Sequence, residues 1–290
     1  MIEQARRPGG WAFAALLSLT AAISAVLIVL VAGSVSPGRE PGASPPDVIP
    51  SEHQARHQLF QELRPVALAN CQLERFGETN DGGYLLCGNL LEGARAAYSY
   101  GISGYDGWGC DIATRLSATT HQYDCFNLQQ PTCTTGKTVF HALCIAGGAH
   151  VDAEGRIFGS LQQQIADNGD TSNRIVVKMD VEGAEWESLL RTPDDVLERI
   201  DQLAIELHGV DEPQYVEVVR KLKRVFVVAH VHANNYTCSE DAAPFPASVY
   251  EVLFVNKRIA RVDDGAPPPK LPHPLDRPNG PLRPDCTPRW

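Results

Sequence analysis

The segment "RIVVKMDVEGAEWESLL" (Arg174–Leu190) decides the fold class of this chain. Its first half is an apolar, β-branched run typical of a strand covered on both faces, and its second half has the pattern of a helix starting near Ala184. Lys178, Asp180 and Glu182 lie between these halves. A carboxylate is costly to bury without a partner, so we expect the strand to end before Asp180 and the acid to lie on a loop.

Strands and helices alternate on both sides of this segment. The pattern predicts strands at 95–102, 120–126, 138–146, 174–181, 201–209, 225–233 and 249–257, and helices at 109–118, 159–169, 184–191 and 213–224. Such alternation implies parallel pairing in a doubly wound α/β sheet of seven strands, with the opening segment as the fourth. The last two strands follow one another without a helix, which predicts an antiparallel hairpin at the sheet edge.

The ends of the first two strands suggest a nucleoside site. Ligands of a doubly wound sheet bind at the carboxyl ends of the strands, near the point where the strand order reverses. Gly101 and Gly104 follow the first strand, where they allow tight turns, and Asp124 ends the second, where a carboxylate can accept hydrogen bonds from both ribose hydroxyls. The alternative is an ordinary turn and a solvated loop aspartate.

The later strand ends carry further acids and histidines. Glu206 and His208 end the fifth strand, and His232 ends the sixth. Together with Asp180, these side chains offer oxygen and imidazole ligands for a divalent metal. Hydrogen-bonded histidines without a metal explain the same pattern.

The region before this domain has the features of a membrane anchor and a stem. Residues 11–33 contain no charged side chain and would form a helix of about 34 Å, which is enough to cross a bilayer. Arg6 and Arg7 precede this stretch, so residues 1–10 should be cytoplasmic and the rest lumenal or extracytoplasmic. A cleaved signal peptide is the alternative. Residues 34–57, rich in Pro, Gly and Ser, predict an extended stem.

Charge and cysteine usage fit a protein of the secretory lumen. Three of the 25 basic and two of the 35 acidic residues precede position 41, so the remainder carries a net charge of −11, which disfavours a nucleic-acid partner. All eight cysteines follow the anchor and none forms a CxxC pair, which predicts disulfides. Cys71 and Cys87 flank a "DGG" turn and are one expected pair. Asn235 begins a glycosylation sequon, and Cys286 is expected to pin the Pro-rich tail, 263–290, onto the 58–262 domain.

Several motifs in order resemble a known family. "RFGETNDGGYLLCG", "YSYGISGYDGW", "HQYDCF", "VVKMDVEGAEWESLL", "IELHG" and "HVHANNY" followed by "YEVLFVNK" are similar to the motif series of the methyltransferase-like protein 24 family, which is related to FkbM-type S-adenosylmethionine-dependent methyltransferases. The resemblance covers roughly residues 68–258. It implies a Rossmann-like methyltransferase fold that binds S-adenosylmethionine across the ends of the first two strands.

The resemblance also assigns roles to residues. It implies that Gly101 lies under the cofactor, that Asp124 binds the ribose and that Asp180 lies near the transferred methyl group. It places a cap over the site, formed by Asp81, Gly82 and Gly83. Asp180 or His208 would serve as the base when the acceptor is a hydroxyl. The family pattern leads us to expect an acid directly after Trp108, but Gly109 stands there and Asp111 is the nearest acid.

Three functions remain open from the sequence. The first is an anchored, lumenal O-methyltransferase that acts on a glycan or another hydroxyl-bearing acceptor. The second is a type II glycosyltransferase using a nucleotide sugar, because an anchor followed by a Pro-rich stem is also the architecture of many Golgi glycosyltransferases. The third is a binding module without catalysis, which the missing acid at Gly109 would favour.

Overall fold

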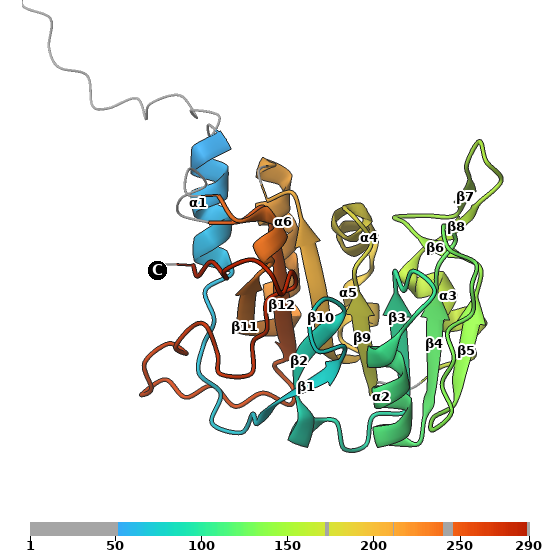
Figure 1. The fold of residues 1–290 in the computed structure, drawn as a ribbon, viewed down its shortest axis with the longest axis horizontal. Helices are drawn as coiled ribbons and strands as arrows, with labels where there is room; N and C mark the ends of the chain where they lie inside the picture. The colour runs from blue at the N-terminus through green and yellow to red at the C-terminus, as the bar shows by residue number, and fades with distance from the viewer. Residues whose placement is uncertain (1–51, 172–173, 211, 240–245, 289–290) are drawn as a thin grey trace, which may run out of the picture. The chain divides into compact units, whose positions relative to one another are not determined.

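The computed structural model describes residues 52–171, 174–210, 212–239 and 246–288 (Figure 1). The predicted cytoplasmic segment, the anchor at 11–33 and the stem up to residue 51 lie outside the described residues. Within those ranges, no helix is long and apolar enough to cross a bilayer.

A seven-stranded sheet forms the centre of the domain. Its strands are β3 (Ala96–Tyr100), β4 (Thr119–Tyr123), β5 (Thr138–His141), β9 (Ile175–Met179), β10 (Ile200–His208), β11 (Phe226–Ala233) and β12 (Val249–Asn256). They lie in the order β11-β12-β10-β9-β3-β4-β5, and β12 runs antiparallel to both of its neighbours. The prediction of a mostly parallel sheet with an antiparallel edge hairpin is therefore confirmed, with β9 as its fourth strand along the chain.

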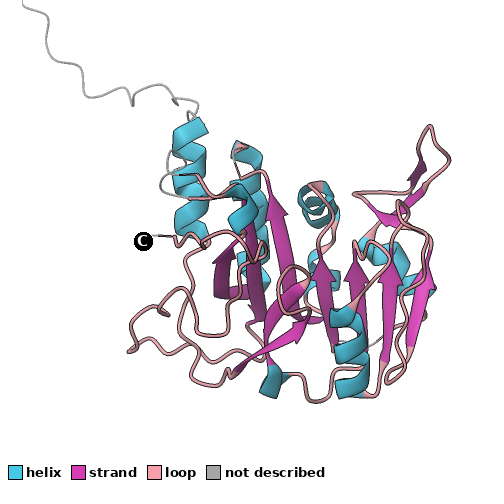
Figure 2. Cartoon of the chain, viewed as in Figure 1, coloured by secondary structure: helices cyan, strands magenta, loops and turns pink. Residues whose placement is uncertain are grey.

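Elements cover both faces of this sheet (Figure 2). One face packs against five helices in the larger hydrophobic core: α1 (Glu52–Glu62), α3 (Leu161–Asp167), α4 (Ala184–Arg191), α5 (Asp194–Leu197) and α6 (Pro213–Val225). The other face packs against α2 (Gly107–Leu116) and a two-stranded hairpin in a smaller core. Alternate residues of β9 enter different cores, with Val177 in the larger and Val176 in the smaller. Burial on both faces explains the unbroken apolar run in the sequence.

The hairpin and a small outer sheet were not predicted. The hairpin consists of β1 (Leu73–Gly77) and β2 (Gly83–Cys87), followed by the 3-10 turn η1 (Gly88–Leu90). The outer sheet has the order β6-β8-β7 and consists of β6 (Cys144–Ile145), β7 (His150–Val151) and β8 (Ile157–Gly159). The strand predicted at 138–146 is therefore wrong in its last part: β5 ends at His141, and β6 leaves the main sheet to pair with β8.

Four disulfides use all eight cysteines. They join Cys71 to Cys87, Cys110 to Cys133, Cys125 to Cys144 and Cys238 to Cys286. The first confirms the expected pair across the hairpin turn, and the last confirms that Cys286 pins the tail. Disulfides are typical of oxidising compartments.

Two predicted boundaries need correction, because both flanking segments take part in the domain. Helix α1 begins at Glu52 and buries Ala55 and Leu59, so residues 52–57 are not stem. The tail buries Asp276 and Asn279, so it is packed onto the domain as well. Sequence composition missed this because the tail is held by polar contacts and a disulfide instead of by an apolar stripe.

Candidate active site

The site lies where the strand order reverses, between β3 and β9. Gly101 directly follows β3 and Asp180 directly follows β9. The main-chain N of Asp180 donates to Tyr100 O, and a Cβ on Gly101 would lie 1.6 Å from Asp180 O. Gly101 also has a φ of +70°. Only glycine allows this close approach. Because β9 ends at Met179, the expectation that Asp180 lies on the loop over the crevice is confirmed.

A cavity of about 390 Å³ opens above these strand ends, within the size range of small-molecule sites. Five of the predicted site residues line it: Asp81, Gly82, Gly101, Asp124 and Asp180. The predicted Gly83, Gly104, Glu206, His208 and His232 are not in the lining. The lining also contains Glu182 of the charged cluster after β9, and residues that were not predicted, among them Tyr105, Asp106 and Phe126.

Gly83 and Gly104 have structural roles instead. A Cβ on Gly83 would lie 2.0 Å from Glu78 O, so glycine is needed where the hairpin turn closes. Gly104 has a φ of +85°, and a Cβ there would lie 2.7 Å from Asn127 Nδ2. Both glycines shape the walls of the site from outside the cavity.

Asp124 ties two loops together. Its Oδ2 accepts hydrogen bonds from the main-chain N of Ile102 and Ser103, and its Oδ1 accepts from those of Phe126 and Asn127. These four bonds fill the usual acceptor capacity of a carboxylate. The ribose role stays a prediction, and the contacts that are present give Asp124 a loop-organising role that needs no ligand.

The acid missing at Gly109 is replaced by Asp106. A Cβ on Gly109 would lie 2.1 Å from Asp106 Oδ2, so this carboxylate fills the space that a side chain at 109 would occupy. Asp106 caps helix α2 by accepting from Gly109 N, and it also accepts from Ser99 and Gln122. Burial raises its pKa, although the charge of Lys178 opposes the shift.

Asp111 is turned away from the cavity. Its Oδ2 accepts from Gly77 N, which joins α2 to the hairpin. The acid nearest to Trp108 in the sequence is therefore not the one that reaches the site. Asp106 lies three residues before Gly109, and no spacing rule could distinguish it from a plain helix cap.

Lys178 is a buried cation beneath the cavity, with 4 % of its surface exposed. Its Nζ donates to Tyr100 O and Gly101 O and lies 3.4 Å from Asp180 Oδ2. A lysine ammonium has three donors, and these contacts use all of them. The lysine therefore fixes the backbone of the β3 turn and orients Asp180.

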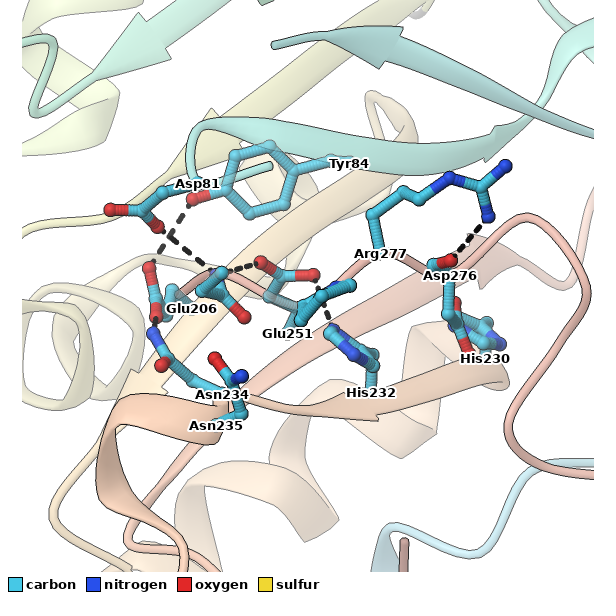
Figure 3. Close-up of polar contacts among 12 residues, drawn as sticks. Asp81, Tyr84, Glu206, His230, His232, Asn234, Asn235, Glu251, Asp276 and Arg277 are labelled. Atoms are coloured by element: carbon cyan, nitrogen blue, oxygen red, sulfur yellow. Dashed lines mark hydrogen bonds and ion pairs between the residues drawn. The ribbon is translucent and has the colours of Figure 1, made fainter. Parts of the chain in front are cut away.

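Asp180 also contacts a buried polar row that crosses the sheet on the hairpin side. The Tyr84 hydroxyl lies 3.0 Å from Asp180 Oδ2. It also lies 3.4 Å from Glu206 Oε2, and Asn234 donates to Glu206 Oε1 (Figure 3). Burial and the charges of Asp180 and Glu251 raise the pKa of Glu206 well above its usual range. Burial and neighbouring negative charges, chiefly that of Asp180, also raise the pKa of Tyr84.

The row continues through β12 and β11. Glu251 is the register partner of Glu206 on one side and of His232 on the other. Its Oε1 accepts from Asn279 of the tail, and its Oε2 lies 3.0 Å from His232 Nδ1. Asn279 also donates to Asp81 at the hairpin turn, so the tail supports the cap of the cavity. Burial opposes protonation of His232, but Glu251, Asp276 and Asp285 raise its pKa to about 9.

The predicted metal set is only partly brought together. Asp180, Glu182 and His208 offer ligand atoms that lie within 4.8 Å of one another. Glu206 and His232 do not belong to this group, because Glu206 bonds to Asn234 and Tyr84 while His232 bonds to Glu251 on a different strand. Glu182, which was not predicted as a ligand, takes their place.

His208 is held by a buried acid of helix α4. Glu185 is fully buried, and its Oε1 accepts from the main-chain N of His208 and lies 3.2 Å from His208 Nδ1. Its Oε2 accepts from Gly183 N at the start of the helix. Burial lowers the pKa of His208, but Glu185, Glu206 and Asp180 together raise it to about 9.

The glycosylation sequon is not accessible in the folded domain. Asn235 is 2 % exposed, and its Nδ2 donates to Gly280 O and Arg283 O. Its Oδ1 accepts from Gly280 N. The sequon at Asn235 therefore has a structural use in this fold, because its amide holds the tail.

Tyr84, Asp106 and Glu185 are the site residues that the sequence did not reveal. Tyr84 lies in a hairpin that was not predicted, and Asp106 and Glu185 have the sequence context of ordinary helix-start acids. The one available signal was the position of Glu185 beside the charged cluster, within two turns of Asp180.

Comparisons with known proteins add little to this geometry. No protein-family model matches the chain, and no curated protein matches its sequence at a significant level. Among solved structures, the chain is similar to the fibrillarin pre-rRNA processing protein of Methanococcus jannaschii, at 13 % identity and a TM-score of 0.34, over 57 % of this chain and 68 % of that one. It is also similar to a Streptococcus mutans protein described provisionally as a methyltransferase and solved in complex with SAH, at 10 % identity and a TM-score of 0.32, over 72 % and 99 %. Scores this low establish neither a function nor a common site.

Proposed function

We propose that the domain is an S-adenosylmethionine-dependent methyltransferase that acts on a hydroxyl-bearing acceptor. The observation that supports this proposal most directly is an acidic cavity at the point where the strand order reverses. Its lining contains five carboxylates, Asp81, Asp106, Asp124, Asp180 and Glu182, and one cationic side chain, Lys178. The family resemblance supports the same donor.

The charge of the cavity favours this donor over a nucleotide sugar. S-adenosylmethionine carries a sulfonium and an ammonium against one carboxylate, so it is a net cation, whereas the diphosphate of a nucleotide sugar carries about two negative charges at neutral pH. Opposite charges attract strongly where water is excluded. Lys178 has no donor left for a phosphate, because Tyr100 O, Gly101 O and Asp180 occupy all three.

Asp180 is the residue that we assign to the chemical step. In methyl transfer to a hydroxyl, the acceptor oxygen forms a bond to the methyl carbon while the bond from sulfur to that carbon breaks. The hydroxyl proton moves to a base, and the products are a methyl ether and the neutral thioether. The reaction needs mainly alignment and a positioned base. Asp180 lines the cavity and is oriented by Tyr84 and Lys178.

The compartment and the acceptor class are further parts of the proposal. The apolar stretch at 11–33, with Arg6 and Arg7 before it, supports a type II anchor, and the four disulfides support an oxidising lumen such as that of the Golgi or endoplasmic reticulum. A glycan is an abundant hydroxyl-bearing acceptor in that compartment.

Calorimetry on the purified full-length protein tests the donor. We expect saturable binding of S-adenosylmethionine and of its demethylated product, and no heat from a nucleotide sugar. Asp106→Asn should weaken binding of the donor, because it removes a carboxylate from the lining, whereas the exposed Glu187→Gln on helix α4 should not. Binding of a nucleotide sugar alone would establish the glycosyltransferase instead. Binding of neither, by a protein with a cooperative thermal transition, would favour the non-catalytic module.

A further inference from the structure

We infer that Asp180, Glu182 and His208 form a divalent-cation site at the rim of the cavity. Asp180 and Glu182 line the cavity, and His208 stands directly behind them at the end of β10. The existence of this site does not depend on the proposed function. Its role, which is to orient the hydroxyls of the acceptor, does rest on that function.

The distances match those around a bound cation. His208 Nε2 lies 3.5 Å from Glu182 Oε2 and 3.9 Å from Asp180 Oδ1. Ligand bonds of about 2.1 Å at angles between 90° and 140° place ligand atoms about 3 to 4 Å apart. Two of the three separations lie in this range, and the ligand atoms of Asp180 and Glu182 lie within 4.8 Å of each other, so a small adjustment of the exposed Glu182 side chain would let all three atoms contact one cation.

The support behind His208 is that of a metal ligand. A carboxylate can only accept a hydrogen bond, so the contact between His208 Nδ1 and Glu185 Oε1 places the ring proton on Nδ1 when the ring is neutral. The lone pair of Nε2 then faces Asp180 and Glu182. Histidine ligands of metals are fixed in this way by an outer carboxylate, and Glu185 is fully buried in that position.

The charge of the cluster also fits a divalent cation. A cation that takes the place of the proton on His208 meets three carboxylates, Asp180, Glu182 and Glu185, and the ammonium of Lys178. Lys178 lies 3.4 Å from Asp180 Oδ2, whereas Asp180 Oδ1 is the oxygen turned toward His208. Asp180 can therefore contact the lysine with one oxygen and a cation with the other, and two residual negative charges match the charge of the ion.

The ligand types indicate which ion binds and what it does. Two oxygens and one imidazole nitrogen favour Mn²⁺, Fe²⁺ or Zn²⁺ over Ca²⁺, which prefers oxygen ligands alone. Three protein ligands leave coordination positions open toward the cavity. Two neighbouring hydroxyls of an acceptor can occupy these positions, and the ion lowers their pKa. The site therefore points to a vicinal diol as the acceptor.

The test is binding of Mn²⁺ to the full-length protein after treatment with EDTA and desalting, measured by calorimetry and by electron paramagnetic resonance. We expect one saturable site with a nitrogen coupling from the imidazole. His208→Gln should abolish the nitrogen coupling and weaken binding at least tenfold, and Glu182→Gln should weaken it similarly. Glu185→Gln should weaken it about 10- to 100-fold, because Glu185 orients the ring of His208. Glu187→Gln, exposed on the same helix, is the matched control and should bind like the unchanged protein.

The proposal is overturned if no saturable binding occurs, or if Mn²⁺ binds equally well to the Glu182→Gln and His208→Gln proteins. Glu182 has 88 % of its side chain exposed, so its substitution should not disturb folding. Titration with S-adenosylmethionine and a nucleotide sugar, each with and without Mn²⁺, separates the two proposals. If the protein binds S-adenosylmethionine but not Mn²⁺, only the proposal of a cation site fails. If the protein binds Mn²⁺, and binds a nucleotide sugar only when Mn²⁺ is present, the cation site stands and the proposal of a methyltransferase fails.

Discussion

Tyr84 and Asp180 join the hairpin to the end of β9, because the tyrosine hydroxyl lies 3.0 Å from Asp180 Oδ2 across 96 residues of sequence. The same hydroxyl lies 3.4 Å from Glu206. The hairpin and Lys178 therefore both orient Asp180 through the same oxygen, Oδ2. Its other oxygen, Oδ1, is the one left to accept a proton.

Tyr84→Phe should lower turnover more than it lowers stability. It removes one hydroxyl from a buried network, which should cost about 1 kcal/mol of unfolding free energy. Asp180 then loses a partner that fixes its orientation, so we expect a fall in kcat of tenfold or more with donor affinity changed little. Steady-state kinetics beside calorimetry would show this split. A rise in the donor Kd that accounts for the whole loss would place Tyr84 in binding instead.

Gly101→Ala should disrupt the close approach of the loops that follow β3 and β9 at the site. The added Cβ would lie 1.6 Å from Asp180 O, and the backbone has a φ of +70°. We expect a loss of at least about 2 kcal/mol of stability, together with loss of donor binding. Gly148→Ala is the control, because a Cβ there meets no atom within 4 Å. Equal stability of the two variants in urea unfolding would show that the β3 and β9 loops do not approach as closely as described.

Stability should fall as pH rises through the range in which His232 loses its proton. The folded pKa of about 9 exceeds the unfolded value of about 6.5, so the stabilisation is complete below about pH 6.5 and lost as pH rises past about 9. Its size is on the order of 3 kcal/mol. Urea unfolding of the protein and of His232→Gln, from pH 6 to pH 10 with the disulfides intact, isolates this effect. A stability difference that does not change over this range would contradict the ion pair with Glu251.

Asn235 should carry no glycan after expression in a secretory pathway. Its amide makes three hydrogen bonds to the tail and is buried. A glycan there would separate the tail from the sheet, so peptide mass spectrometry of the folded protein should find Asn235 unmodified. Recovery of glycosylated peptide from protein that melts cooperatively would show that the tail is not packed as described.

Much of the main sheet could be predicted because each strand carries its own signal. The run "IVVKM" is apolar since both faces of β9 are covered, and the acid that follows it marks the strand end. The positions of Gly101, Asp124 and Asp180 follow from parallel pairing, which brings the carboxyl ends of strands to one edge.

The rest depends on contacts between distant residues. Tyr84 reaches Asp180 from a hairpin whose strands are only five residues long, and Asn279 reaches Asp81 and Glu251 from a tail without regular structure. Polar residues at these positions look solvated in a sequence, because nothing local indicates what covers them. For the same reason Glu206 and His232 were assigned as ligands, although their partners lie on neighbouring strands and in the hairpin.

The place of β12 between β10 and β11 has a consequence for synthesis on the ribosome. Strand β11 is made before β12, yet its hydrogen-bonding partner in the sheet is β12. Until about residue 256 has left the exit tunnel, β10 and β11 each expose an unpaired edge, which is a template for association with other chains. The last strand therefore completes the sheet only when nearly the whole polypeptide has been made, and a nascent chain that pauses earlier should need a chaperone to stay soluble.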